Sequence, residues 1–564
     1  MQSLKFGSFR LILVIVFIGL IKPYVNSQPL SPIDGERLNY RQILFEVPGV
    51  SGATNYLFSF QLCNFRAEQC KTIFETKSKY RAVILTDPFE FGKTYRWSYK
   101  ALKGRKVIYQ SREFTFQIAQ SPLVDSLVQK IVFVKPNTKP LSGILLVDGL
   151  KLALDCKGKP VLFLNYSYDH SIRDINLSPQ GTLTLVDNRL GEVKEIRLNG
   201  EMVWIGDTRA ENGPGRNDKF HHEFEKLSSG NYLAATKKRV GDFDESAGLQ
   251  GVPENTLCES IVEMDESGEQ VWRFDLLPEL KRQFGIAPTS ELFNPTRLGH
   301  LNGILADEAG GIVYASFKTF NTVFKIEKST NRILYQYGLK RINFKDSLEP
   351  GLKFEQQHAP IFSRNGNILL FNNGNQETGS GITELLVSDQ LDSINEVVNQ
   401  IFFKDYFSKD TYAGQMGSVQ ETGKGRYLVC MGSMPHFFEI DARKKKLLWQ
   451  AYTFQNTRWE EGGKIWKPLF SYRINYYSSL YPYHFIVDKI GKPGTGKQKI
   501  RVVNTGTEAD SYILVHLDES GQVRLELKQV FLQPGKSVKL ELPSGYSRFE
   551  VKSIRSKFTE SLHF

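Results

Sequence analysis

Apolar and polar residues alternate along much of this 564-residue chain with a period of two, as in Tyr95-Arg96-Trp97-Ser98-Tyr99. Successive side chains of a β-strand point to opposite faces of a sheet, so this alternation predicts strands with one buried face. Two segments that connect strands, 278–284 and 392–400, are the best candidates for helices. The pattern therefore predicts an all-β fold with few helices.

Residues 28–120 contain short alternating strands separated by turn residues, among them Ile43–Val47 and Tyr56–Leu62. A run of about seven such strands is typical of a β-sandwich. The strand that holds Tyr95 and Trp97 resembles those of fibronectin type III modules. We therefore expect an N-terminal, fibronectin-III-like β-sandwich over residues 28–120.

From residue 121 to 490 the pattern becomes a degenerate repeat of a strand, a turn centred on glycine, an apolar strand and a further pair of strands. Five copies begin at Asp174, His222, His300, His358 and Gly417. A sixth, from Tyr472 to Val487, is weaker, and strands near Leu145–Phe163 can close the ring. Repeats of about 40 or more residues with four strands each indicate a six-bladed β-propeller. The first strand of each blade then lines a central channel, where residues at one offset converge.

The start of the chain predicts export. Lys5 and Arg10 precede the apolar run Leu11–Ile21, which is too short to cross a bilayer and is followed by small residues. This arrangement indicates a signal peptide over residues 1–27, with Gln28 as the first mature residue. We therefore expect a periplasmic or secreted protein.

The end of the chain, residues 491–564, is again rich in strands and predicts a small C-terminal β-domain. Its first residues, Gly491–Gln498, nearly spell a phosphate-binding loop. However, Gln498 replaces the Ser or Thr that binds magnesium, and no helical pattern follows. We interpret this segment as a linker.

Composition narrows the class of partner. The chain has 72 Lys and Arg against 61 Asp and Glu, a formal charge of +11. These basic residues are scattered among strands and turns, whereas a nucleic-acid-binding protein gathers them on one face. We expect no nucleic-acid partner, and no membrane anchor once the signal is cleaved. The β-domains at both ends offer surfaces for self-association, so a homodimer is an open expectation.

Five cysteines in an exported protein permit disulfides and leave one thiol over. Cys63 and Cys70 lie at either end of a short, turn-like segment and form the best pair. Cys156, Cys258 and Cys430 lie in apolar strands, where an inert buried thiol is expected. None has the Cys-x-Pro-x-Arg pattern of formylglycine sulfatases, which argues against that class of hydrolase.

Histidine is the residue that points most directly to chemistry. Three of the nine histidines, His222, His300 and His358, open blade repeats at the same offset. If those strands are innermost, the three imidazoles face one another across the channel, and folding a β-blade requires no histidine there. His221 alternates with His222 along its strand and is expected to point away from the channel.

The segments around these histidines resemble the bacterial arylsulfate sulfotransferases that work without a nucleotide sulfate donor. The matching segments are Phe220–Phe224, His300–Ile304 with Ser316–Lys318, and Gln357–Pro360 with Leu370–Gly374. The resemblance spans most of residues 145–490, and Gln-His-Ala with Phe-x-Asn-Gly is its most specific part. It implies a six-bladed propeller with an N-terminal β-domain, export to the periplasm and no cofactor.

The resemblance also implies a role for each residue. His358 matches the histidine that attacks sulfur and carries the group as sulfohistidine, and His222 and His300 match histidines around the sulfuryl oxygens. The family arginine falls at Lys318, a departure that keeps the positive charge but loses the planar fork. The implied reaction is ping-pong transfer from an aryl sulfate to a phenol, with His222 or His300 taking the acceptor's proton.

Two residues are expected to bind substrate, Asn302 and His221. A plain turn asparagine explains Asn302 equally well, and His221 is the weaker member of its pair. His436, beside aromatic residues, is expected to be structural, and His170 is a weaker channel candidate.

Two other classes of function remain open. Three channel histidines can ligate zinc or copper, although only Glu223 offers a nearby carboxylate, and we expect no metal. A secreted propeller can also bind a glycan or a protein without catalysis. Lys318 in place of the expected arginine slightly favours that alternative.

Overall fold

The structure is a computed structural model. It describes residues 30–64, 69–125, 129–134, 142–166, 171–206, 213–215, 217–243, 249, 252–285, 297–338, 354–388, 396–408, 411–460, 463–490, 498–518, 520–543 and 547–563. The predicted signal peptide, His170 and most of the proposed linker lie outside these residues.

Strands dominate the described residues, as the alternating pattern predicts. The one α-helix among them is α1 (Leu276–Phe284), which contains the predicted segment 278–284. The second helix prediction was wrong where it can be checked, because Val397–Phe402 forms strand β29 and pairs with its neighbour β28 (Gly379–Leu385). None of the described helices is long and apolar enough to cross a membrane.

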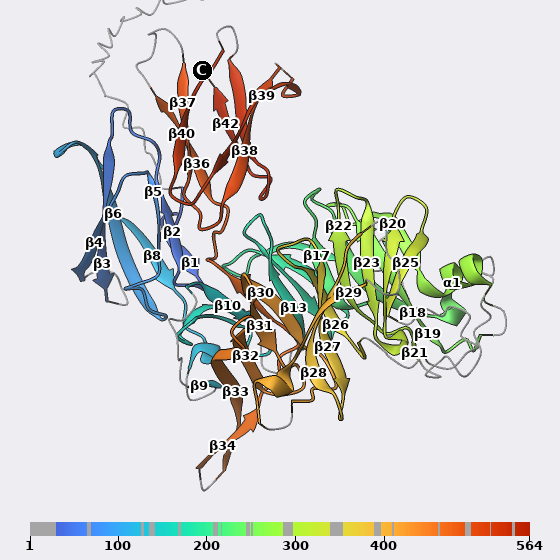
Figure 1. The fold of residues 1–564 in the computed structure, drawn as a ribbon. Coiled ribbons are helices and arrows are strands. Elements are labelled where there is room, and N and C mark those ends of the chain that lie inside the picture. The colour runs from blue at the N-terminus through green and yellow to red at the C-terminus, as the bar shows by residue number, and fades with distance from the viewer. Residues whose placement is uncertain are drawn as a thin grey trace, which may run out of the picture.

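The N-terminal region forms a six-stranded and a two-stranded sheet (Figure 1). The larger sheet contains β1 (Glu36–Leu38), β3 (Asn55–Cys63), β4 (Cys70–Ser78), β6 (Lys93–Lys103), β7 (Lys106–Gln110) and β8 (Phe114–Ile118), and the smaller contains β2 (Ile43–Glu46) and β5 (Ala82–Leu85). Phe58, Phe60 and Trp97 alternate with less buried residues along β3 and β6. The Phe45 ring of β2 lies 5.1 Å from that of Trp97, so aromatic packing joins the two sheets.

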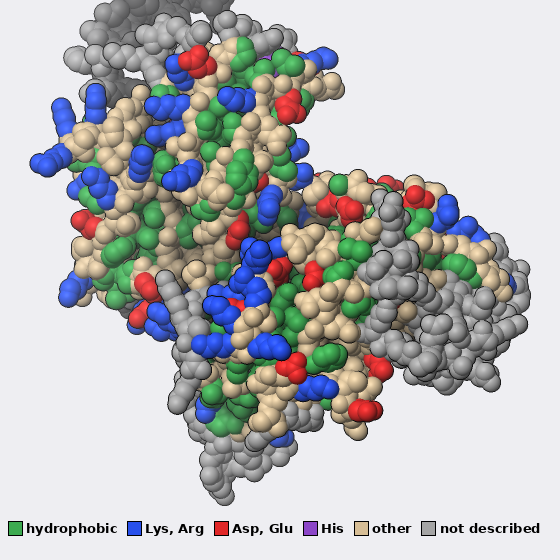
Figure 2. Space-filling model, viewed as in Figure 1, with side chains coloured by type: hydrophobic (Ala, Val, Ile, Leu, Met, Phe, Trp, Pro, Cys, Tyr) green, Lys and Arg blue, Asp and Glu red, His purple; other side chains and the backbone are tan. Residues whose placement is uncertain are grey.

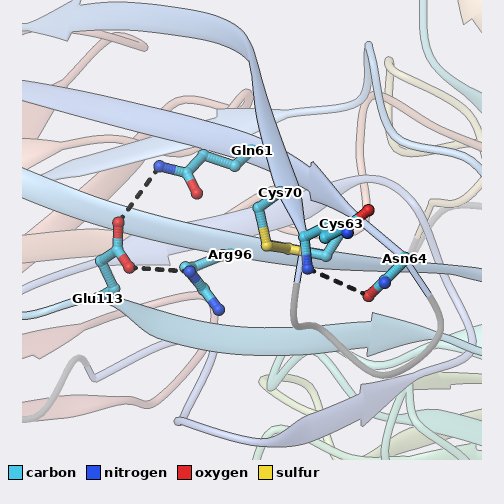
Figure 3. The surroundings of a disulfide bond; sticks show 7 residues. Gln61, Cys63, Asn64, Cys70, Arg96 and Glu113 are labelled. Carbon is cyan, nitrogen blue, oxygen red and sulfur yellow. Dashed lines mark hydrogen bonds and ion pairs between the residues drawn. A yellow bond between two sulfur atoms is a disulfide. The ribbon is translucent and has the colours of Figure 1, made fainter.

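A disulfide joins Cys63 and Cys70 at the ends of the paired strands β3 and β4 (Figure 3). The predicted pairing is therefore confirmed. Nearby, the Glu113 carboxylate accepts hydrogen bonds from Gln61 and Arg96, each at 3.2 Å. The three remaining cysteines are free, with Cys258 and Cys430 buried and Cys156 partly exposed.

Six four-stranded antiparallel sheets follow one another along the chain. Five of them have consecutive strands: β13 (Ile172–Leu177), β14 (Leu183–Asp187), β15 (Glu192–Ile196), β16 (Met202–Gly206); β17 (Lys219–Lys226), β18 (Tyr232–Arg239), β19 (Leu257–Met264), β20 (Gln270–Asp275); β22 (Leu301–Asp307), β23 (Ile312–Phe317), β24 (Thr322–Glu327), β25 (Arg332–Gly338); β26 (His358–Phe362), β27 (Ile368–Asn375), β28, β29; and β30 (Ser418–Gly423), β31 (Arg426–Cys430), β32 (His436–Asp441), β33 (Lys446–Glu460). Three short strands extend these sheets: β9 (Gln129–Val134) and β34 (Gly463–Pro468) pair with β33, and β21 (Arg297–Leu298) pairs with β19.

The sixth sheet joins distant parts of the chain. Its strands are β10 (Ile144–Val147), β11 (Leu152–Asp155), β12 (Pro160–Phe163) and β35 (Ile474–Tyr477), in the order β12-β11-β10-β35. The first strands of the six sheets contact one another in the cycle β35, β13, β17, β22, β26, β30 and back to β35. The sheets thus form a propeller-like ring around one axis (Figure 1).

The weak sixth repeat is shorter than the sequence predicts. Only β35 belongs to the ring, because β36 (Phe485–Ile490) pairs with β37 (Lys499–Asn504) in the following sheet. The segment near Leu145–Phe163 supplies the other three strands, as expected.

The C-terminal residues form two sheets that pack on the N-terminal region (Figure 1). One contains β36, β37 and β40 (Ser537–Glu541), and the other β38 (Asp510–Leu517), β39 (Val523–Leu532), β41 (Arg548–Ser553) and β42 (Thr559–His563). Arg81 binds Glu46 of its own region, Asp488 at 3.1 Å and Glu560 at 3.4 Å. Lysine and arginine side chains are spread over both regions and the adjoining part of the ring (Figure 2).

Candidate active site

The inner strands of the ring carry β-bulges where the candidate residues lie. Register shifts interrupt the pairing of β17, β22 and β26 with their second strands. His222 and His300 adopt left-handed backbone conformations, with φ of 58° and 52°. In β26 that conformation belongs to Ala359, φ 52°, and not to His358. The equal offset predicted for the three histidines therefore holds for two of them, since bulges re-aim side chains differently in each strand.

His222 and His300 lie together in the structure. Their ring centroids are 5.3 Å apart with the planes steeply inclined. The ring of Tyr472, which directly precedes Arg473 and β35, lies 5.7 Å from that of His222. Two predicted histidines thus lie close together, and His222 also contacts Tyr472, a residue that was not predicted from the sequence.

His358 has one nitrogen fixed by hydrogen bonds. Its Nδ1 lies 2.7 Å from the side-chain oxygen of Asn373 and 2.9 Å from the carbonyl oxygen of Gln356. The Asn373 NH2 donates to the carbonyls of Ala413 at 2.6 Å and Met416 at 3.0 Å, so its oxygen faces His358. Both partners of Nδ1 are acceptors, so Nδ1 carries the proton and Nε2 keeps its lone pair.

The surroundings of His358 keep its imidazole neutral. The side chain is buried, and burial together with the charges of Lys318 and Arg473 lowers the pKa of His358 to about 3. The hydrogen bond to Asn373 opposes this shift only in part. His358 is therefore an uncharged base at any pH near neutrality.

Lys318 contacts two segments of the site, one at His300 and the other at Gly414. It begins the short 3-10 helix Lys318–Phe320 after β23, and its backbone N–H donates to the His300 carbonyl at 3.1 Å. Its ammonium donates to the Gly414 carbonyl at 3.4 Å, in the same segment that orients Asn373. The cation predicted from the sequence is thus placed between His300 and the residues that position His358.

Asn302 is fully buried between strands. Its amide donates to the Gln357 carbonyl at 2.7 Å, and its own carbonyl accepts from the Tyr472 hydroxyl at 3.1 Å. Asn302 therefore holds β22 against the residue before His358. The contacts support a positioning role for this residue, where the sequence analysis expects substrate binding.

His221 lies behind His222 and is only 1% exposed. Its Nδ1 is 2.6 Å from Nδ1 of His222, and its Nε2 is 2.7 Å from a carboxylate oxygen of Glu259. It points away from the channel, as its alternation with His222 predicts. Both ring nitrogens of His221 thus contact other side chains of the protein, and direct contact with a substrate, the other expectation, stays a prediction.

A buried cluster of charged side chains lies next to Tyr472. The Arg473 guanidinium binds Asp174 at 2.6 Å and holds Glu223 with both terminal nitrogens. Burial lowers the pKa of Arg473, but the charges of Glu223 and Asp174 raise it by more. Burial raises the pKa of Glu223 despite this pairing. Arg473 is not among the residues predicted from the sequence, and the available signal was its position beside Tyr472 at the start of the weak sixth repeat.

A cavity of about 310 Å³ lies on the other side of this cluster. Residues of all six inner strands line it, among them Asp174, Glu225, Leu305, Pro360, Val419 and Asn475. This cavity is therefore part of the central channel of the ring.

A family model of arylsulfotransferases (ASST) matches residues 145–465, which is more than half of the chain. The chain belongs to the arylsulfotransferase family. Its match covers all three predicted histidines and Lys318, the position at which the sequence departs from the expected arginine.

Solved structures with a similar arrangement share little sequence with this arylsulfotransferase family member. A streptogramin B lyase is 9% identical with a TM-score of 0.34, covering 62% of this chain and 99% of the lyase. A virginiamycin B lyase from Staphylococcus aureus is 10% identical with a TM-score of 0.30, covering 58% of this chain and 99% of that one. The sequence matches none of the curated proteins compared with it.

The other histidine that the sequence singles out within the described residues makes structural contacts. The His436 ring stacks on Tyr452 with centroids 4.5 Å apart, and its Nε2 lies 3.0 Å from the Gln450 side-chain oxygen. Burial lowers the pKa of His436 to about 4. Within the described ranges, no group of three or more His, Cys, Asp or Glu residues is arranged to hold a metal ion.

Proposed function

We propose that this protein is an aryl sulfotransferase that moves a sulfuryl group from a phenolic sulfate ester to a phenol through His358. Membership of the arylsulfotransferase family supports the general activity. The observation that carries the mechanism is the fixed tautomer of His358, whose Nδ1 is held by Asn373 and Gln356. The arrangement leaves Nε2 as the nucleophile.

In the first step, Nε2 of His358 attacks the sulfur of the donor. The N–S bond forms, the S–O bond to the aryl group breaks, and the aryloxide leaves with that bond's electron pair. The developing positive charge on the imidazole is stabilised by its Nδ1–H, which donates to the Asn373 oxygen at 2.7 Å. No cofactor is needed, because the donor brings the sulfuryl group.

In the second step, a phenol attacks the sulfur of sulfohistidine. Its O–H bond breaks as a base takes the proton, the new O–S bond forms, and the N–S electron pair returns to Nε2 of His358. Charge spreads over the sulfuryl oxygens in both steps, as in phosphoryl transfer. We propose that Lys318 and the imidazole of His300 stabilise this charge, while His222 or His300 takes the acceptor's proton; one such donor is worth about 2.7 to 4 kcal/mol.

The same proposal places the enzyme outside the cytoplasm. It is supported by the predicted signal peptide and by the Cys63–Cys70 disulfide, since disulfides persist in oxidising compartments. Fractionation of the source cells tests it, and a cytoplasmic location of the mature chain contradicts it.

The function is tested with a chromogenic aryl sulfate, with and without a phenol, followed by intact and peptide mass analysis. We expect acceptor-dependent release of the aryloxide and a sulfuryl group at His358. H358A should lose this activity by a factor on the order of 10⁴ or more. Treatment with a chelator should have no effect. Unchanged release by H358A contradicts the mechanism, and no release by the wild type favours a binding propeller.

A further inference from the structure

A chain of three side chains runs from β19 to the inside of the ring. Glu259 of β19 is fully buried, and its Oε2 lies 2.7 Å from Nε2 of His221. His221 continues to His222 through the 2.6 Å contact between their Nδ1 atoms. His222 then faces His300 and Tyr472. A carboxylate and two imidazoles are therefore linked in series, and only the last of the three faces the site.

The short contacts indicate where the protons lie. Oε2 of Glu259 lies 2.7 Å from Nε2 of His221 as an ion pair and not as an aligned hydrogen bond, and its negative charge favours the tautomer that carries the proton on Nε2. In neutral His221 the Nδ1 is then an acceptor, and the proton in the 2.6 Å contact belongs to Nδ1 of His222. This leaves the lone pair of His222 on Nε2.

We propose that Glu259 and His221 form a proton relay that makes Nε2 of His222 the base for the acceptor phenol. The proposal rests on the proposed function and assigns one of its steps to a specific histidine. His222 is then a catalytic residue, and Glu259 and His221 are positioning residues that act through it. The arrangement extends the logic by which a buried carboxylate orients a catalytic imidazole.

The proton balance of the step is complete. The phenol O–H bond breaks and the Nε2–H bond of His222 forms as the oxygen attacks sulfur. The proton on Nδ1 of His222 can pass across the 2.6 Å contact to Nδ1 of His221. The positive charge then lies on His221, next to the Glu259 carboxylate. On release of the aryloxide in the next turnover the same path runs in reverse.

Other ionisable groups surround the relay and set the background for its pH dependence. Lys237 lies opposite Glu259 in the register of β18 and β19, a position at which Cβ atoms are within about 5.5 Å. Around His222 the groups are His300 and Tyr472, and around Tyr472 they are Arg173, Glu223 and Arg473. The test variants leave all of these unchanged.

The relay is tested with E259Q, which keeps the size of the side chain and removes its charge. The matched control is E263Q, which removes another buried carboxylate from β19 that binds Asn231 at 2.7 Å and Lys328 instead of the histidines. A nitrophenyl sulfate, whose leaving group needs no proton, reports the first half-reaction as a burst. A chase with phenol then reports the second, and the burst amplitude counts the folded sites.

We expect E259Q to retain the burst rate within about twofold and to slow the phenol step about tenfold or more, because a positioned base contributes about 10²- to 10⁴-fold. The pH midpoint of the phenol step should move to lower pH, since the imidazolium loses its neighbouring negative charge. E259D, which keeps the charge, should keep the wild-type midpoint, and E263Q should change neither.

Two results overturn the relay. One is a phenol step in E259Q with the wild-type rate and pH midpoint. The other is an equal slowing of both half-reactions without a change in midpoint, which indicates a merely structural role. Either result leaves the proposed function intact as long as the wild-type enzyme carries the sulfuryl group on His358. Absence of that group in the wild type instead refutes the proposed function.

Discussion

The two ends of the central channel carry opposite chemistry on one set of strands. His222 and His358 lie early in β17 and β26, and His300 directly precedes β22. Residues later in the same strands line the cavity at the other end, where Glu225 and Glu308 lie. One end of the ring thus gathers imidazoles and a lysine, and the other gathers carboxylates.

Desolvation acts on both ends and drives each toward its neutral form. It lowers the pKa of His358 to about 3, with help from the cations Lys318 and Arg473. At the other end desolvation raises the pKa of Glu223, with help from the carboxylates Asp174 and Glu225 and against the opposing charge of Arg473. Desolvation is the largest cause of the pKa shift at both ends, and like charges near each group add to it. The comparison also gives Arg473 a role, because its pairing with Asp174 and Glu223 separates the two ends.

The largest effect is expected on the free energy of unfolding, when Arg473 is replaced. R473M leaves Asp174 and Glu223 buried without their cation, and breaking a buried pair in this way costs about 3–5 kcal/mol. Chemical denaturation of both proteins measures the loss of unfolding free energy. The control R282M removes an exposed pair with Glu279 and should cost less than about 1 kcal/mol. Equal, small losses in the two variants would show that the buried pairs of Arg473 stabilise the fold no more than an exposed pair does.

The sequence predicts the parts of the site that repeat and misses those that depend on ring closure. Three histidines near the starts of successive blades stand out because a β-blade does not require them. Tyr472 and Arg473 lie in the weakest repeat, whose other strands come from residues 144–163, so their approach to His222 and Glu223 is a property of the closed ring.

Two further residues became visible only through their contacts. Asn373 belongs to the Phe-x-Asn-Gly segment, but its hold on His358 depends on the carbonyls of Ala413 and Met416 that orient it. Glu259 is one of two buried glutamates in β19, and the alternation of apolar and polar residues alone could not show that it faces His221. The β-bulges give His222 and His300 a left-handed backbone conformation that His358 lacks. The spacing of these residues in the sequence does not predict this difference.

The second largest effect is expected on the rate of aryloxide release, when Lys318 at the histidine end is compared with Lys226 at the carboxylate end. K318M should slow the burst of aryloxide about 10²- to 10³-fold, because one charged donor to the sulfuryl oxygens is lost. K226M removes a cation that lines the carboxylate end and binds Glu195 at 2.9 Å. Its burst rate per folded site should stay within about twofold of wild type. Similar losses in the two variants would mean that the channel acts through its overall charge. K318R restores the fork of the family arginine and should retain the burst.

The smallest effect concerns stability at acid pH, which depends on the neutral state of His358. Its pKa is about 3 in the folded protein and near 6.5 in an unfolded chain, so the unfolded state binds the extra proton between these values. Stability from this residue is therefore complete above about pH 6.5 and is lost as the pH falls, by about 2 kcal/mol at pH 5. H358Q has no such proton to bind, so its unfolding free energy should fall by about 2 kcal/mol less than that of the wild type between pH 7 and pH 5. Parallel pH profiles for the two proteins would show that His358 is protonated as readily in the fold as outside it, and Nε2 would then not be free to attack sulfur at mildly acidic pH.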